Sequence, residues 1–224
     1  MKTMHACAAF AATFAFGSTV LGTVIQSESF ETYTTGSGYY VDLDAVTDHW
    51  LVNYDDHTVS GPGWGTYYTN TRDGTGLSDG DYFGVTSYSG AVGAFTDGEQ
   101  GFQMSDVDGM ATMVFDPVAG ATGVSFDLFV DGTGWEGDDM IKIEVGGVVL
   151  LDTTGFDIDD DFGYLEEAWT TFNGGAGELR ISLDSNSGTE AIFIDNIQWT
   201  GVPAPGVLAL LGLAGLASRR RRRH

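Results

Sequence analysis

Two stretches in the second half of the chain alternate apolar and polar residues over the length of a β-strand. In residues 123–130, Val124, Phe126, Leu128 and Val130 share one face while Ser125 and Asp127 share the other, and residues 178–184 follow the same rule. A side-chain period of two places every second residue on one face, so each stretch predicts a strand that covers a core on one side. No segment shows a 3.6-residue apolar period of helical length, and the 33 glycines favour many tight turns.

These patterns are typical of an all-β protein. About nine or ten short strands fold most economically as two antiparallel sheets packed face to face. The sequence therefore predicts an antiparallel β-sandwich of the jelly-roll type. Its strands are expected at residues 39–44, 49–54, 81–88, 111–115, 123–130, 140–145, 148–152, 168–172, 178–184 and 191–199.

The last expected strand carries an acid inside an apolar run. Residues 191–194 are all apolar, and Asp195 then falls on the same side of an ideal strand as Phe193, Ile197 and Trp199. Burying an ionised carboxylate costs several kcal/mol unless it is paired or bound to a metal. Two interpretations stay open. Either Asp195 has a buried partner, or Asp195 and Asn196 begin a bend and face water.

Acidic residues dominate the body of the chain. Residues 23–201 contain all 32 acids but only three basic residues, Arg72, Lys142 and Arg180, which gives them a formal charge of −29. This charge excludes a basic nucleic-acid groove as the main function. It favours a highly solvated surface, the binding of divalent cations, or a salty habitat that screens the repulsion between the acids. The single cysteine, Cys7, precedes this body, so the body has no disulfide.

The first residues have the composition of a secretory signal. Lys2 supplies a positive charge, residues 6–21 are mostly apolar, and residues 20–22 offer a small-residue cleavage site. The sequence therefore predicts a signal peptide, with its helix, at residues 1–22 and one β-sandwich domain at residues 23–201. Export would expose the acids to external calcium.

Residues 202–224 differ abruptly from the body. A Pro-Ala-Pro motif is followed by an apolar run at 207–218, and the chain then ends in five arginines and His224. This order resembles the PEP-CTERM sorting signal, although Ala204 stands where that family usually has glutamate. The resemblance implies export to the cell surface and cleavage by an exosortase. The residues that carry this resemblance are Pro203, Pro205, Arg219, Arg220 and Arg221.

The apolar run of this tail is short for a membrane anchor. Twelve residues at about 1.5 Å each span about 18 Å, against a hydrocarbon core of about 30 Å. The arginines are expected to stay on the cytoplasmic side. The tail therefore predicts a short helix that holds the chain in the inner membrane only transiently. The alternative is an ordinary C-terminal anchor, which would also give an exported protein.

Three motifs of the body resemble those of secreted jelly-roll domains that include carbohydrate-binding modules. They are SFET at 29–32, WEGDD at 135–139 and IFIDNI at 192–197. In such families a structural calcium often joins an acid near the first strand to an acid on the last strand. The resemblance implies that Glu31 and Asp195 hold this calcium, with backbone carbonyls completing its six to eight oxygen ligands.

Other acids compete for a metal. Asp106 and Asp108 lie on one side of a short segment before a strand, where they either hold a cation or form a turn. The DIDDD run at 157–161 is not an EF-hand, because Phe162 stands where that loop needs glycine. A solvated acidic turn is the preferred interpretation of this run.

Aromatic residues suggest a ligand. Trp64, Tyr67 and Tyr68 lie in a Gly-rich stretch, and rings presented on a loop stack on sugar faces. The alternative is that these rings only cover the edge of the core. In that case the tryptophans of the core are Trp50, Trp135, Trp169 and Trp199.

No catalytic motif is present. The body has two histidines and no HExxH, GxSxG or GxxxxGK motif. Glu136 with Asp138 or Asp139, or Glu166 with Glu167, would serve as a glycosidase pair, but 32 acids produce such pairs by chance. The sequence therefore predicts a non-catalytic exported protein that binds polysaccharide with a structural calcium. A secreted sandwich-fold glycosidase is the alternative.

Overall fold

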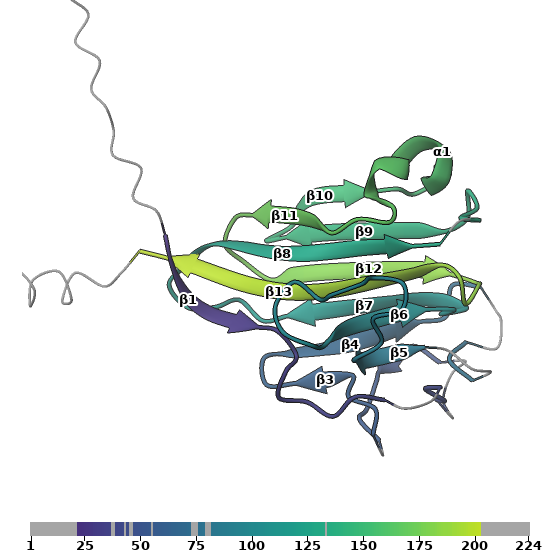
Figure 1. Cartoon of the computed structure of the whole chain (residues 1–224), viewed down its shortest axis with the longest axis horizontal. Coiled ribbons are helices and arrows are strands. Elements are labelled where there is room, and N and C mark those ends of the chain that lie inside the picture. The colour runs from purple at the N-terminus through teal and green to yellow at the C-terminus, as the bar shows by residue number, and fades with distance from the viewer. Residues whose placement is uncertain are drawn as a thin grey trace, which may run out of the picture.

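The computed structural model describes residues 22–202 apart from 37–38, 43, 45–46, 55, 73–75, 79–81 and 133. In this part of the chain two antiparallel sheets pack face to face, as Figure 1 shows, which confirms the predicted β-sandwich. The expected signal helix and sorting tail lie outside the described residues. No helix among the described residues is long and apolar enough to span a membrane.

The first sheet has the order β11-β8-β13-β6-β5, and β1 pairs with β13 beside this path. The long strands β8 and β13 form its centre. Its strands are β1 (Thr23–Glu28), β5 (Phe83–Thr86), β6 (Gly101–Ser105), β8 (Ala121–Asp131), β11 (Thr170–Gly174) and β13 (Ala191–Gly201).

The second sheet has the order β10-β9-β12-β7-β4-β2, and β3 pairs with β4. One short helix, α1 (Ile158–Phe162), and the 3-10 turn η1 (Gly163–Leu165) lie between β10 and β11 in the chain. The strands of this sheet are β2 (His49–Trp50), β3 (Ser60–Gly61), β4 (Trp64–Thr69), β7 (Gly109–Phe115), β9 (Met140–Val145), β10 (Val148–Asp152) and β12 (Leu179–Ser185).

The core between the sheets follows the predicted alternation. Phe126 and Leu128 of β8 face Ile181 and Leu183 of β12 across the sandwich, and all four are at most 1% exposed. Trp64 on β4 is also buried there. Burial of apolar surface, worth about 25 cal/mol per Å², is therefore the main force that holds the two sheets together.

A β-bulge divides β13. Its pairing with β8 shifts between Asp195 and Gln198, and Asn196 has the left-handed φ of 54°. The extra residue switches the faces, so Ile194 and Ile197 both point into the core while Asp195 and Phe193 point outward. The expectation that Asp195 shares a face with Ile197 and Trp199 is therefore wrong. The interpretation that Asp195 faces water is also wrong, because its exposure is 0%.

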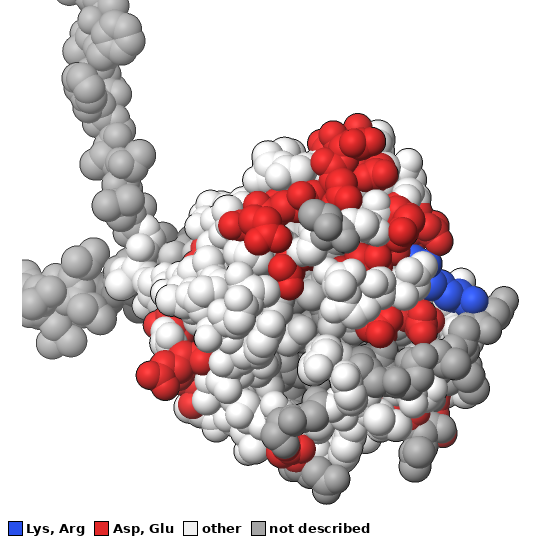
Figure 2. Space-filling model, turned by 45° about the vertical axis from the view of Figure 1, so that its right-hand side comes forward, with Lys and Arg blue, Asp and Glu red and all other residues white. Residues whose placement is uncertain are grey.

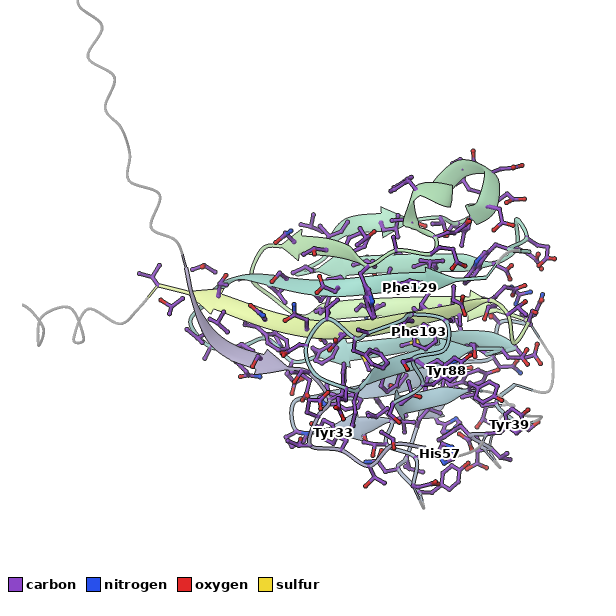
Figure 3. All side chains as sticks on the ribbon, in the orientation of Figure 1. Tyr33, Tyr39, His57, Tyr88, Phe129 and Phe193 are labelled. Carbon is purple, nitrogen blue, oxygen red and sulfur yellow. The ribbon has the colours of Figure 1, made fainter. Side chains whose placement is uncertain are left out.

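A second apolar cluster covers part of the outer face of the first sheet. Phe193 of β13 and Phe129 of β8 point outward, as Figure 3 shows, and Val92 and Phe95 of the loop before β6 pack on them. Trp169 lies against this cluster and donates from its Nε1 to the Ala94 carbonyl at 3.1 Å. The loop before β6 is therefore fixed to the sheet.

Several local predictions differ from the structure. Residues 39–44 form no strand in their described part, and the strand expected at 49–54 is limited to β2. The stretches of β4 and β6 were not expected as strands. The acidic run at 157–161, in contrast, is a turn as expected: it forms the single helical turn α1, in which Asp160 and Asp161 are exposed. The Asp157 side chain caps this turn by accepting from the Asp160 amide at 3.2 Å.

Candidate functional site

The outer face of the first sheet carries a hollow of about 390 Å³ beside the apolar cluster. This volume falls within the range of about 300–1,000 Å³ that is usual for ligand sites. Strands β5 and β6, the end of β8 and the start of β13 contribute to it. Its lining residues are Gly36, Tyr82, Thr86, Ser87, Tyr88, Gln103, Asp131, Gly188 and Ala191.

The floor of this hollow is shaped by small residues beside a polar one. Gln103 on β6 pairs with Gly84 on β5, which has no side chain. On β13, Ala191 pairs with Asp131 of β8 and presents only a methyl group. Gln103 is 7% exposed yet lines the hollow, so its amide is presented from the bottom.

Exposed tyrosines form the walls. Tyr82 is 45% exposed and Tyr88 is 55% exposed. The Tyr82 ring packs against Tyr39 at 4.7 Å between centroids. Tyr88 stacks on Phe193 at 6.4 Å, which ties this wall to the apolar cluster (Figure 3). Both rings are thus held by packing while part of each faces solvent.

A second hollow of about 470 Å³ shares Ser87 with the first. It lies over the loop before β6, so the two hollows adjoin at Ser87. Its lining residues are Ser87, Ser89, Gly93, Ala94, Phe95, Gly98 and Glu99. We call the two hollows together the tyrosine groove.

Asp131 is the acid that lines the first hollow. Burial raises its pKa, and the neighbouring Glu167 carboxylate raises it further, while a hydrogen bond from the Gly132 amide lowers it. The carboxyl group offers oxygen acceptors in the same hollow as the Gln103 amide, which both donates and accepts. Aromatic rings beside such groups suit a molecule with apolar ring faces and hydroxyl edges.

The structure contradicts a loop position for Trp64 and Tyr68. Both lie on β4 and point into the core, with exposures of 6% and 0%. Tyr67 points to the opposite side, where its ring lies 5.3 Å from that of Trp50. Trp50 is 55% exposed, so the assignment of this tryptophan to the core is wrong. Of the three predicted aromatic ligands, only Tyr67 reaches the surface.

Glu31 and Asp195 meet at one loop, residues 96–100. The Glu31 Oε1 accepts from the amides of Glu99 and Gln100, both at 2.7 Å. The Asp195 Oδ2 accepts from the Asp97 amide at 2.8 Å and from the Thr96 hydroxyl at 3.1 Å. The fold thus brings the two acids that the resemblance implied to the same loop, Glu31 from the turn after β1 and Asp195 from β13.

The donor set at this loop fits a calcium ion in part. Burial raises the pKa of Asp195 to about 6, and the hydrogen bonds from Asp97, Asn196 and Thr96 lower it. No basic side chain of the described residues pairs with it, so a cation would stabilise its ionised form. Glu31 is exposed and hydrogen bonded to amides, so backbone carbonyls must supply most other ligands.

Asp106 and Asp108 lie between β6 and β7, and both have left-handed φ values, 53° and 47°. The Asp108 amide donates to the Ser185 carbonyl at 2.9 Å, and Tyr68 donates to the Asp108 carbonyl at 3.1 Å. This is the geometry of a turn that is tied to its neighbours. Neither residue belongs to the acid cluster with metal-ligand spacing found in the described part of the chain.

That cluster consists of Glu136, Asp139 and Glu190, each with one oxygen within 4.8 Å of the others. Burial raises the pKa of Asp139 to about 6 and that of Glu190 to about 7. The sequence suggested a pairing of Glu136 with Asp139 but not with Glu190, which lies more than 50 residues away in the chain. Only the alignment of β9 and β13 in different sheets brings the three together.

No protein-family model matches the chain, and no curated protein matches it at a significant level. Among solved structures it is similar to the K2 cleaved adhesin domain of Lys-gingipain, with a TM-score of 0.46 and 16% identity over 78% of this chain and 97% of that chain. It is also similar to TmCBM61 in complex with beta-1,4-galactotriose, with a TM-score of 0.37 and 15% identity over 64% and 90%.

A third similar structure is the family 11 carbohydrate-binding module of the cellulosomal cellulase Lic26A-Cel5E of Clostridium thermocellum. Its TM-score is 0.34, with 12% identity over 71% of this chain and 97% of that chain. Two of these three similar structures are carbohydrate-binding modules. What each neighbour binds is a property of that protein.

Proposed function

We propose that this chain is a non-catalytic polysaccharide-binding protein of the cell surface or extracellular matrix. The observation that carries the proposal is the tyrosine groove, where the exposed Tyr82 and Tyr88 flank Gln103 and Asp131. The rings offer flat faces to the C–H faces of sugars, while the amide and carboxyl groups bond their hydroxyls. The two joined hollows favour a chain of several sugars over a single one.

Calcium is part of this proposal. Glu31 and Asp195 would bind the ion together with carbonyls of the 96–100 loop. The ion would supply the positive charge that compensates the buried Asp195 carboxylate. Gly98 and Glu99 of this loop line the second hollow. A bound ion would therefore fix one wall of the groove as well as the fold.

Export and sorting are also proposed, from the sequence of the two ends. The body would pass the inner membrane behind its signal peptide, and an exosortase would cleave near Pro203 and Pro205. Mass spectrometry of the surface-associated protein tests this. Peptides covering Arg219 to Arg223 in most molecules would contradict cleavage.

A glycan array with the purified body, followed by affinity electrophoresis in the best polysaccharide, tests the binding function. Tyr82→Ala and Tyr88→Ala should each weaken binding by about 1 to 3 kcal/mol. Trp50→Ala is the matched control, since this equally exposed ring lies on the other sheet. Loss of binding with Trp50→Ala alone would move the site to that sheet, and no retained glycan would count against the function.

The alternative, a secreted glycosidase, is addressed by a hydrolysis screen on the same polysaccharides. Retaining glycosidases hold two carboxyl groups about 5–5.5 Å apart and inverting ones about 6.5–9.5 Å apart across the scissile bond. Among the described residues that line the first hollow, Asp131 is the one with a carboxyl group, so it is the residue to replace in this test. Release of reducing sugar that Asp131→Asn abolishes would favour the enzyme.

A further inference from the structure

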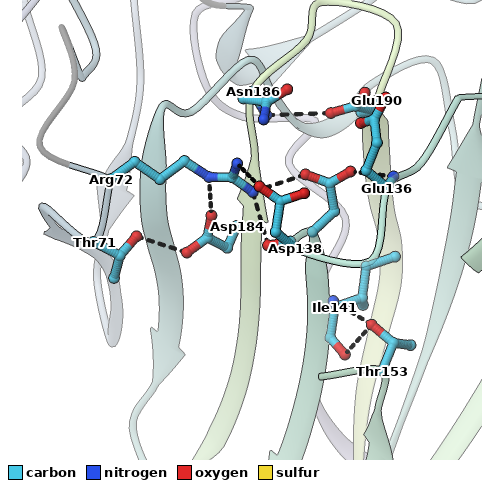
Figure 4. Close-up of polar contacts among 10 residues, drawn as sticks. Thr71, Arg72, Glu136, Asp138, Ile141, Thr153, Asp184, Asn186 and Glu190 are labelled. Atoms are coloured by element: carbon cyan, nitrogen blue, oxygen red, sulfur yellow. Dashed lines mark hydrogen bonds and ion pairs between the residues drawn. The ribbon is translucent and has the colours of Figure 1, made fainter. Parts of the chain in front are cut away.

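The acid cluster lies at one end of the sandwich, where both sheets contribute. Glu190 directly precedes β13 of the first sheet, Asp139 directly precedes β9 of the second, and Glu136 lies in the loop before it. In Figure 4 the carboxyl groups of Glu136 and Glu190 lie close together. Glu190 is 2% exposed and Asp139 is 1% exposed, whereas Glu136 is exposed.

The basic residues of the body leave this cluster short of positive charge. Arg72 bonds Asp139 at 2.8 Å, but it also bonds Asp138 at 2.9 Å and pairs with Asp184 (Figure 4). Lys142 pairs with Glu144, and Arg180 pairs with Glu178. Figure 2 shows the same imbalance, with wide acidic areas and one small basic area on the face in view.

The buried Glu190 carboxylate has few hydrogen bonds or ion pairs to offset the cost of its burial. Its Oε2 accepts from the Asn186 amide at a long 3.2 Å, and within the described residues it has no ion pair. A carboxylate that is almost fully buried with one weak hydrogen bond is costly to ionise. The Glu190 carboxyl group is therefore expected to be either protonated or bound to a cation.

A separate observation favours the cation. The hydroxyl of Ser185 is fully buried and has no hydrogen-bond partner within the described part of the chain. Because Asp184 of β12 pairs with Met140 of β9, the next position along the ladder places Ser185 opposite Asp139. Ser185 continues the core-facing series of Leu183, so its hydroxyl points to the side of the sheet that Asp139 also faces.

We infer that Glu136, Asp139 and Glu190 bind a divalent cation, with the Ser185 hydroxyl as a fourth protein oxygen. A set made only of oxygens fits a hard cation such as calcium rather than zinc, which prefers nitrogen and sulfur. Arg72 and the Glu136 amide hold the two oxygens of Asp139 at 2.8 and 2.7 Å, which orients this carboxylate. This site is separate from the loop that joins Glu31 and Asp195.

The cation would also act on the tyrosine groove, a consequence that rests on the proposed function. Ser185 and Glu190 bracket the turn 186–189, and Gly188 of this turn lines the first hollow together with Ala191. Binding at both ends of the turn would fix this wall. Glycan affinity should therefore rise with calcium through this site.

Terbium luminescence tests the metal site directly. Trp135, which is 2% exposed, precedes Glu136 in the chain and should sensitise a terbium ion bound there. We expect a terbium signal that calcium displaces, and at least tenfold weaker terbium binding in Glu190→Gln. The same loss is expected for Asp139→Asn. Glu144→Gln, which changes an acid on β9 that pairs with Lys142, is the control and should bind as the wild type does.

Two further variants test whether the terbium signal comes from this cluster and not from the site of Glu31 and Asp195. Asp195→Asn should keep the Trp135-sensitised signal, and Trp135→Phe should lose the signal while keeping calcium binding by isothermal titration. A cluster that only shares a proton gives a different result: no displaceable terbium, and Glu190→Gln that melts higher than the wild type with and without calcium. That result would overturn the inference.

Glycan binding is measured separately, so the two proposals fail separately. If Glu190→Gln abolishes metal binding but leaves the calcium dependence of glycan affinity unchanged, the effect on the groove is refuted and the site stands. If no glycan binds, the terbium titration still decides whether the cation site exists.

Discussion

Replacing Trp64 by alanine tests whether this ring belongs to the core or to a ligand site. Trp64 is 6% exposed, and its ring meets those of Phe30, Tyr33, Phe102 and Phe115 at centroid distances of 5.6, 5.5, 5.6 and 6.0 Å. Its Nε1 also donates to the Tyr33 hydroxyl at 3.0 Å. Alanine removes all of these contacts and leaves a cavity between the sheets.

The expected loss of stability follows from these contacts. Truncating a buried tryptophan to alanine costs about 3–5 kcal/mol, and the lost hydrogen bond adds about 1 kcal/mol. We therefore expect Trp64→Ala to lower the free energy of unfolding by about 4–6 kcal/mol. For a domain of this size, this corresponds to a fall in melting temperature of about 8–24 °C.

Urea unfolding followed by far-UV circular dichroism measures this loss, with the slope of the transition checked for constancy. Trp50→Ala is the control, because its ring is 55% exposed, and it should cost less than about 1 kcal/mol. A loss below about 1 kcal/mol for Trp64→Ala, together with weaker glycan binding, would refute the core position.

Three further predictions concern the buried acids and a tight turn. Calcium should raise the melting temperature beyond matched sodium chloride, and Asp195→Asn or Glu31→Gln should each remove most of the increment due to their site. In EDTA, the free energy of unfolding should fall as pH rises from about 4.5 to 7, because the raised pKa of Glu190, about 7, favours the protonated folded state. In Glu190→Gln this fall should be smaller by about 3 kcal/mol, as measured by urea unfolding at a series of pH values. The same pH dependence as in the wild type would contradict the claim that burial raises the pKa of Glu190. Gly132→Ala should destabilise the fold, since Gly132 has a φ of 91° and the added Cβ would lie 1.8 Å from the Thr189 carbonyl oxygen; a melting temperature within 1 or 2 °C (~0.5 kcal/mol) of the wild type would refute this.

Much of the sandwich could be predicted from the sequence, because one-sided strands such as β8 and β12 show their burial in their alternation. Strand β4 escaped prediction although Trp64, Thr66 and Tyr68 alternate, because Gly65 and the preceding glycines are typical of a turn. The bulge at Asn196 was also not predicted from the sequence; it lies in the pairing of β13 with β8, where the other partner of β13 changes from β6 to β1.

The candidate sites depend even more on tertiary structure. Glu31 and Asp195 were found through a resemblance, and the loop that joins them was not. The tyrosine groove could not be predicted, because Tyr82 and Gln103 become neighbours only through the pairing of β5 with β6. Sequence alone reports which residues are available for such sites, while the register of the strands decides which of them meet.

Amide chemical-shift mapping with the retained polysaccharide tests the central proposal most directly. If the tyrosine groove binds the glycan, the largest changes should fall on Thr86, Tyr88 and Gln103, which line it. The face of the other sheet around Trp50 and Tyr67 should stay unchanged. Changes that concentrate on Trp50 and Tyr67, with none at Gln103, would contradict this account.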